Sequence, residues 1–155
     1  MSHETIIYGF IEGATWKPPE YRRFQEANLD VLGALPETDE FPPITRGMFS
    51  CTPLESPCTF RAQVIHFGGS MNGLNFDAVP EWILKFESVL SRLYWFEATV
   101  HVWTDYIDGA YQFWWKIGDK CLSAYHDGDP QPTSTWTRKN LHLVRSLDEP
   151  PHEQL

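Results

Sequence analysis

Hydrophobic and polar residues alternate along the stretch from Trp95 to Tyr125 with the period of two that is typical of β-strands. The dipeptide Asp108-Gly109 is a strong signal for a two-residue hairpin turn, and Gly118-Asp119 is a second turn signal. We therefore predict a three-stranded antiparallel meander over residues 95–125. Pairing outward from the first turn places Val102 opposite Trp115. It produces an almost wholly apolar row that faces the core, made of Val100, Val102, Thr104, Phe113, Trp115 and Ile117.

The other face of this predicted meander mixes large aromatic side chains with charges. In the same register, the pairs of this row are Trp103 with Trp114, His101 with Lys116, and Asp105 with Gln112. A slip of one residue would bury this polar row, so the hydrophobic pattern favours the register. An antiparallel sheet needs only one apolar face to fold, which makes the second face a candidate partner-binding surface. The candidate binding residues on it are Glu97, His101, Trp103, Asp105, Trp114 and Lys116.

Two interpretations of Trp103 and Trp114 remain open at this point. They are either half-buried partners across neighbouring strands or exposed residues that dominate the binding energy of an interface. The choice depends on whether the C-terminal segment folds over this face.

The rest of the chain predicts an α+β fold in a single domain over residues 1–147, followed by a disordered tail at 148–155. Two helices are expected at 19–34 and 79–93, because apolar residues recur there at helical spacing. Strands are expected at 5–11, 44–51, 59–67 and 136–146, and a flexible loop at Gly68–Gly73. This order predicts a ferredoxin-like βαββαβ open-faced antiparallel sheet with an added C-terminal hairpin. Both helices would then cover one sheet face.

The composition narrows the classes of partner. The chain has 155 residues, of which 42% are hydrophobic and 15% aromatic, and its formal net charge is −9. Such a surface repels phosphate backbones, which argues against nucleic acid, and it steers a basic partner towards the protein. The acidic loop residues Glu37, Asp39 and Glu40 are therefore added to the predicted partner surface.

The same composition predicts a cytoplasmic location and no membrane partner. No apolar run approaches the ~20 residues that a membrane helix needs, and the first residues lack the pattern of a signal peptide. The three cysteines are odd in number and lack metal spacing, so free thiols in a reducing compartment are expected.

Catalytic and metal-binding signals are weak, so neither enzymatic activity nor a cofactor or metal is predicted. His101 and Asp105 offer only two ligands for a metal, and Cys121 would need His101 as its base to act as a nucleophile. The segment from His66 to Ser70 resembles a glycine-rich phosphate or oxyanion loop but lacks the lysine of a phosphate loop. The alternative function is therefore a small-molecule-binding or enzymatic α+β domain with a pocket near His66 and the Gly68–Gly73 loop.

Three strings in the chain resemble small bacterial immunity proteins, which are encoded beside polymorphic toxins such as those delivered by type VI secretion and by Rhs-type carriers. These strings are Pro42–Phe49, Gln63–Ser70, and Lys85-Phe86-Glu87 followed by Leu93-Tyr94-Trp95. The resemblance implies a cytoplasmic antitoxin that binds one cognate toxin domain, expected to be basic, and blocks its active site or its access to substrate. No catalytic residues carry over, because such proteins act by occlusion. A homodimer that hides the aromatic face is the remaining alternative.

Overall fold

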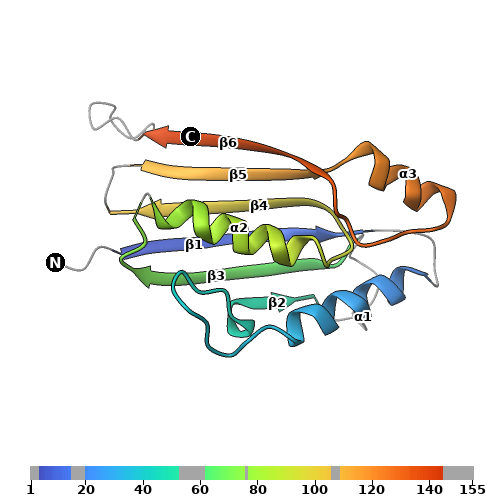
Figure 1. Ribbon diagram of the computed structural model, residues 1–155, viewed down its shortest axis with the longest axis horizontal. Coiled ribbons are helices and arrows are strands. Elements are labelled where there is room, and N and C mark those ends of the chain that lie inside the picture. Colours follow the sequence, from blue (N-terminus) through green and yellow to red (C-terminus); the bar gives the residue numbers. More distant parts are fainter. Residues whose placement is uncertain (1–3, 15–19, 53–61, 76, 106–108, 145–155) are drawn as a thin grey trace, which may run out of the picture.

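The computed structural model describes residues 4–14, 20–52, 62–75, 77–105 and 109–144 (Figure 1). In this part of the chain, six strands form one open antiparallel sheet in the order β2-β3-β1-β4-β5-β6, accompanied by three α-helices. The elements are β1 (Glu4–Gly13), α1 (Glu20–Gly33), the 3-10 turn η1 (Arg46–Met48), β2 (Phe49–Cys51), β3 (Val64–Asn72), α2 (Ala78–Leu90), β4 (Trp95–Thr104), β5 (Gly109–Ile117), α3 (Asp119–Asp127) and β6 (Trp136–Val144). The predicted α+β class with an open antiparallel sheet is confirmed. The predicted tail, 148–155, lies outside the described residues.

The core lies between one face of the sheet and helix α2, which crosses the sheet over its central strands (Figure 1). The apolar stripe of α2 buries Trp82 and Phe86 completely. The Phe86 ring centroid lies 5.0 Å from that of Phe67 on β3 and 5.1 Å from that of Trp115 on β5. Burying each such side chain contributes roughly 1.5–3 kcal/mol, so this aromatic cluster is the main attachment of α2 to the sheet.

Helix α1 begins close to the position that the sequence predicts and is fixed by a buried amide. The Nδ2 group of Asn28 donates to Gln63 Oε1 at 3.1 Å and to the carbonyl of Tyr94 at 3.0 Å, while its Oδ1 accepts from the Tyr94 N–H at 2.8 Å. Because all the hydrogen bonds of this amide are made inside the protein, its burial carries little desolvation penalty.

Strand β1 occupies the centre of the sheet and packs tightly on β4 at Gly9. A Cβ atom at this position would lie 2.0 Å from the carbonyl oxygen of Thr99 and 2.8 Å from the ring of Phe67. Only glycine therefore fits here, and the absence of a side chain leaves room for the Phe67 ring in the core.

Glu87 on α2 links the helix to the far side of the sheet. Its Oε1 accepts a hydrogen bond from Trp115 Nε1 on β5 at 2.9 Å and another from the guanidinium of Arg138 on β6 at 2.8 Å. One carboxylate therefore holds two neighbouring strands to the same helix.

The predicted three-stranded meander is wrong in its third segment, because residues 119–127 form helix α3. Gly118 precedes this helix in an extended conformation, and Gly128 ends it with a φ of 83°. Leu122 and Tyr125 lie one turn apart and pack with Phe24 of α1 at the end of the sheet. The Gly118-Asp119 pair, read as a turn, is the start of a helix.

The predicted pairing of β4 with β5 is also wrong, although the faces are right. Val102 lies opposite Tyr111, not opposite Trp115, so the pairing is shifted by four positions. An even shift keeps every side chain on its predicted face. The connection is longer than the expected two-residue turn, because Thr104 at the end of β4 pairs with Gly109 at the start of β5, while the Asp105 N–H donates to the Glu4 carbonyl on β1 at 3.2 Å. The connection spans the four positions 105–108, of which 106–108 lie outside the described residues.

The predicted Gly68–Gly73 loop is wrong, because β3 continues through it to Asn72. Gly68 pairs with Tyr8 and Gly69 with Ile7, so backbone pairing with β1 holds the glycines extended. The strand expected at 44–51 begins only at Phe49, after the 3-10 turn. The helices at Glu20–Gly33 and Ala78–Leu90 and the strand from Trp136 confirm three further predictions.

Candidate partner-binding face

The face of the sheet opposite α2, called the open face below, presents alternate residues of five strands. Strand pairing aligns them in rows across the sheet. One row contains Ser70, Ile6, Trp103 and Ala110, the next contains Gly68, Tyr8, His101, Gln112 and Leu141, and the third contains His66, Phe10, Thr99, Trp114 and Lys139.

The open face carries a concentration of exposed apolar side chains. The exposed fractions are 36% for Ile6, 50% for Tyr8, 39% for Phe10, 43% for Trp103 and 53% for Leu141. Among the described residues, seven large apolar side chains are exposed, and five of them lie on this one face. Exposed apolar residues that occur singly are ordinary, but a contiguous group of this kind marks an interaction surface.

The centre of the open face is a stripe that runs along β1, made of Ile6, Tyr8 and Phe10. The Tyr8 ring stacks on His101 of β4, with centroids 4.9 Å apart and planes 13° apart. On the other side, Gly68 of β3 lies beside Tyr8 and has no side chain to cover it. Tyr8 at the centre of the stripe is therefore in contact with a side chain of β4 but is not covered by a side chain at Gly68 of β3.

Carboxylates lie at both ends of this apolar stripe. Glu4 and Asp105 are at one end, where Glu4 Oε1 accepts a hydrogen bond from Ser70 Oγ at 2.6 Å. Glu12 and Glu97 are paired at the other end. The open face thus combines an apolar centre with an acidic border along β1 and β4, which is the usual arrangement of an interface centre and its rim.

Trp114 on β5 is half-buried and divides two hollows near the β6 edge. Its Nε1–H donates to Glu97 Oε1, and Lys139 Nζ lies 5.5 Å from its ring centroid. One hollow of about 260 Å³ is lined by Gln112, Trp114, Lys139, Asn140 and Leu141, and another of about 140 Å³ by Trp114, Lys116, Thr137 and Lys139. The positive charge of this face is thus concentrated on β5 and β6.

The structure brings six of the sequence-predicted site residues together on the open face and gives them new neighbours. Trp103 lies opposite Ala110, not opposite Trp114, and is exposed, so no described segment covers it. Trp114 lies opposite Thr99. The remaining predicted residues of this face are placed as follows: Glu97 opposite Lys116, His101 opposite Gln112, and Asp105 beside Glu4.

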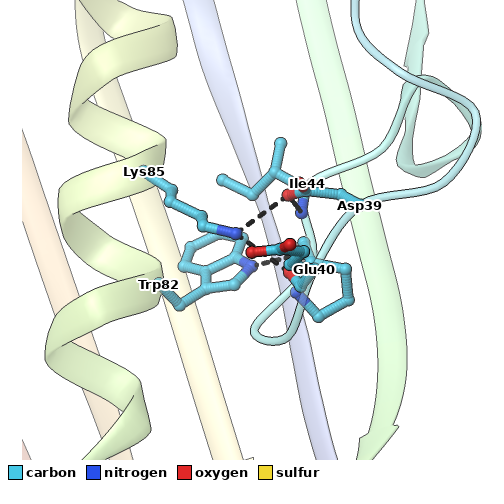
Figure 2. Close-up of polar contacts among 6 residues, drawn as sticks. Asp39, Glu40, Ile44, Trp82 and Lys85 are labelled. Atoms are coloured by element: carbon cyan, nitrogen blue, oxygen red, sulfur yellow. Dashed lines mark hydrogen bonds and ion pairs between the residues drawn. The ribbon is translucent and has the colours of Figure 1, made fainter.

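The acidic loop residues lie elsewhere, and two of them, Asp39 and Glu40, contact Lys85 of α2 (Figure 2). Asp39 Oδ2 accepts from the Ile44 N–H at 3.0 Å and from Lys85 Nζ at 3.0 Å, and the Lys85 ammonium also reaches the Glu40 carbonyl. The Ile44 N–H, followed by Lys85, lowers the pKa of the Asp39 carboxyl. Glu37 pairs with Arg46. These contacts give the carboxylates of Asp39 and Glu37 partners within the protein, whereas Glu40 takes part through its backbone carbonyl.

Ile6, Tyr8 and Phe10 were not among the site residues predicted from the sequence. The run from Thr5 to Ile11 is continuously apolar, which is typical of a strand buried on both faces. The predicted architecture could have identified these three residues. If both helices cover one face of the sheet, a continuously apolar central strand must expose half of its side chains on the opposite face.

The candidate chemical groups do not assemble into a metal centre among the described residues. No group of three or more His, Cys, Asp or Glu side chains in the described ranges is placed to hold a metal ion. Cys121 lies on α3, not on the outer face of a strand, with its Sγ 3.1 Å from Thr135 Oγ1. His66 is exposed on the open face, in a strand instead of beside a loop.

Comparison of the chain with family models, with curated proteins and with solved structures finds no match. Within the described part of the chain, none of the helices is long and apolar enough to cross a membrane.

Proposed function

We propose that this chain is an immunity protein that binds a cognate toxin domain through the open face and occludes it. The observation that carries the proposal is the group of exposed apolar side chains on a sheet face that the helices leave uncovered, bordered by carboxylates. The resemblance of the three sequence strings to immunity proteins supplies the class of partner. In this proposal the protein acts in the cytoplasm, performs no catalysis and uses no cofactor.

The charge of the chain supports a basic toxin domain as the partner. A net charge of −9 attracts a basic domain over a distance and speeds association, and added salt screens this attraction. Aromatic side chains such as Tyr8 and Trp103, once desolvated, slow dissociation. Both effects favour an inhibitor that must capture its target quickly and hold it.

We also propose that the first four strands and two helices form a ferredoxin-like unit. The order β2-β3-β1-β4, with α1 after β1 and α2 after β3, supports this topology. Strands β5 and β6 then widen the sheet beyond β4, and α3 lies between them in the chain. The extension adds the lysine-bearing part of the open face.

The test is neutralisation of a toxin in growing cells. Each protein encoded beside this chain is expressed alone, and those that stop growth are expressed again together with the wild-type chain or a variant. We expect the wild type to restore growth and to co-purify with one neighbour. Tyr8→Ala and Trp103→Ala should weaken that binding about tenfold or more, mainly through faster dissociation.

The matched control is Leu84→Ala, which removes an apolar side chain that is 64% exposed on α2. This variant should neutralise and bind like the wild type, and thermal melts of all three variants establish that they are folded. If no neighbour is toxic and bound, the proposed function is wrong. If the open-face variants bind as well as Leu84→Ala, the face is not the interface.

A further inference from the structure

The border of the open face restricts the shape of what can cover it. We infer, resting on the proposed function, that the partner covers β1 and β4 with an amphipathic α-helix that is apolar in its middle and carries Lys or Arg at both ends.

The expected length of the covering helix follows from the distance between the carboxylates at the two ends of β1. Glu4 and Glu12 are eight residues apart on one strand, with Ile6, Tyr8 and Phe10 between them. At about 3.4 Å per residue, the carboxylates are separated by about 27 Å along the strand. A helix rises about 1.5 Å per residue, so about 18 residues, or five turns, span this distance. Basic residues in its first and last turns would meet the two acidic ends.

The region made of the apolar stripe and its acidic ends is only as wide as one covering helix. The acidic border and the central apolar residues belong to β1 and β4, which are neighbours about 4.8 Å apart. A helix with its side chains is about 10 Å across and covers both strands. Lys116 and Lys139, on β5 and β6, repel a basic segment on that side, whereas Gly68 and Ser70 on β3 leave space on the other.

The covering segment is expected to be a helix because of its own backbone hydrogen bonds. An extended segment laid on a sheet face leaves its own N–H and C=O groups without partners, and burying such groups is costly. A helix satisfies these groups internally and can place an apolar stripe on the sheet as a third layer. A second sheet would also satisfy them, but it would extend over the lysines of β5 and β6.

The experiment uses synthetic 20-residue helical peptides and the full chain. The first peptide has a central leucine stripe at helical spacing and lysines in both end turns. Two matched peptides carry either glutamates in place of those lysines, or the same composition with the leucines spread around the helix. Binding is followed by the fluorescence anisotropy of a labelled peptide. We expect the first peptide to bind at least about tenfold more tightly than either matched peptide.

Variants of the protein locate the bound peptide. Tyr8→Ala should weaken binding of the basic-ended peptide about tenfold, Leu84→Ala should leave it unchanged, and Lys139→Glu should leave it unchanged or strengthen it. Raising the salt concentration should weaken binding, because the end contacts are ionic.

The inference is overturned if the glutamate-ended peptide binds equally well or if Tyr8→Ala binds like the wild type. It is also overturned if the free chain sediments as a dimer that Tyr8→Ala dissociates, or if a labelled single-stranded oligonucleotide competes for the face. If a toxic neighbour binds the open face but no peptide does, the helix inference fails alone. If the peptide binds but no neighbour is neutralised, the proposed toxin partner fails alone.

Discussion

Removal of the Glu87 carboxylate should weaken the attachment of α2 to β5 and β6 with a measurable loss of stability. Glu87 Oε1 is the acceptor for the indole N–H of Trp115, a fully buried residue, and for the guanidinium of Arg138. Glu87→Ala removes both contacts at once. Glu87→Gln keeps an oxygen acceptor in the same place but removes the charge.

The magnitude can be worked out from the two contacts. A buried N–H left without an acceptor costs about 1–3 kcal/mol. The Arg138 side chain is 37% exposed, so its ion pair contributes less, about 0–1 kcal/mol. Glu87→Ala should therefore lower the free energy of unfolding by about 1–4 kcal/mol. Glu87→Gln should cost about 1 kcal/mol, because a neutral acceptor makes the weaker hydrogen bond.

The assay is urea unfolding followed by circular dichroism, at equal protein concentration and with slopes compared between variants. A double-mutant cycle with Trp115→Phe isolates the indole contact, since phenylalanine has no N–H to strand. In the Trp115→Phe background, Glu87→Ala should cost about 1–2 kcal/mol less than in the wild type. Glu81→Ala, on the same helix but exposed, serves as the control and should cost below about 1 kcal/mol.

Two results would refute this reasoning. A loss below about 1 kcal/mol for Glu87→Ala would mean that the indole N–H finds another acceptor or water. Equal costs of Glu87→Ala in the two backgrounds would mean that the carboxylate and the indole do not interact.

Three further predictions concern a close approach, a pH dependence and a thiol. Gly9→Ala should lower the free energy of unfolding by about 3 kcal/mol or more, because its Cβ would overlap the neighbouring backbone. Gly33→Ala, where a Cβ would have nothing within 4 Å, should raise the free energy of unfolding by up to about 1 kcal/mol. Urea unfolding measures both variants, and equal effects would contradict the packing at Gly9. Because the pKa of Asp39 is lowered from its ordinary value of 3.8, its stabilising contribution is present above that pH and is lost as the pH falls further. The difference in stability between the wild type and Asp39→Asn should therefore be larger at pH 7 than at pH 3, and a difference that does not change would exclude the linkage. Burial opposes the Cys121 thiolate, but hydrogen bonds from Thr135 and Ser134 outweigh it and lower the pKa of Cys121. Burial raises the pKa of Cys51. At neutral pH, mass spectrometry should therefore find that iodoacetamide alkylates Cys121 faster than Cys51, and the reverse order would contradict this prediction.

The parts of the fold that the sequence predicted correctly depend on local periodicity. Helices α1 and α2 follow from apolar residues at helical spacing, and the inward direction of Val100 and Trp115 follows from strict alternation. The register of β4 with β5 does not follow from alternation, because any even shift preserves it. The observed register goes with a connection over the four positions 105–108, a length that alternation does not specify.

Ambiguous local signals account for the other errors. Gly118-Asp119 suits a hairpin turn and a helix start equally well, and only the packing of Tyr125 selects the helix. Gly68-Gly69 suits a loop, but backbone pairing with β1 overrides that preference. Asp39 was predicted to belong to the partner surface because it lies in an acidic loop, whereas its partner Lys85 lies 46 positions further along the chain.

The central position of β1 also has a consequence for folding of the protein during its synthesis on the ribosome. This strand is made first, yet its neighbours β3 and β4 end at Asn72 and Thr104. At roughly 5–20 residues per second, synthesis from the end of β1 to the end of β4 takes on the order of 5–20 s. Until β3 is complete both edges of β1 lack their partners, and until β4 is complete one edge still does, a state that favours pairing with other nascent chains. The centre of the sheet can therefore be completed only after Thr104 has been made, and β1 presents an unpaired edge until then.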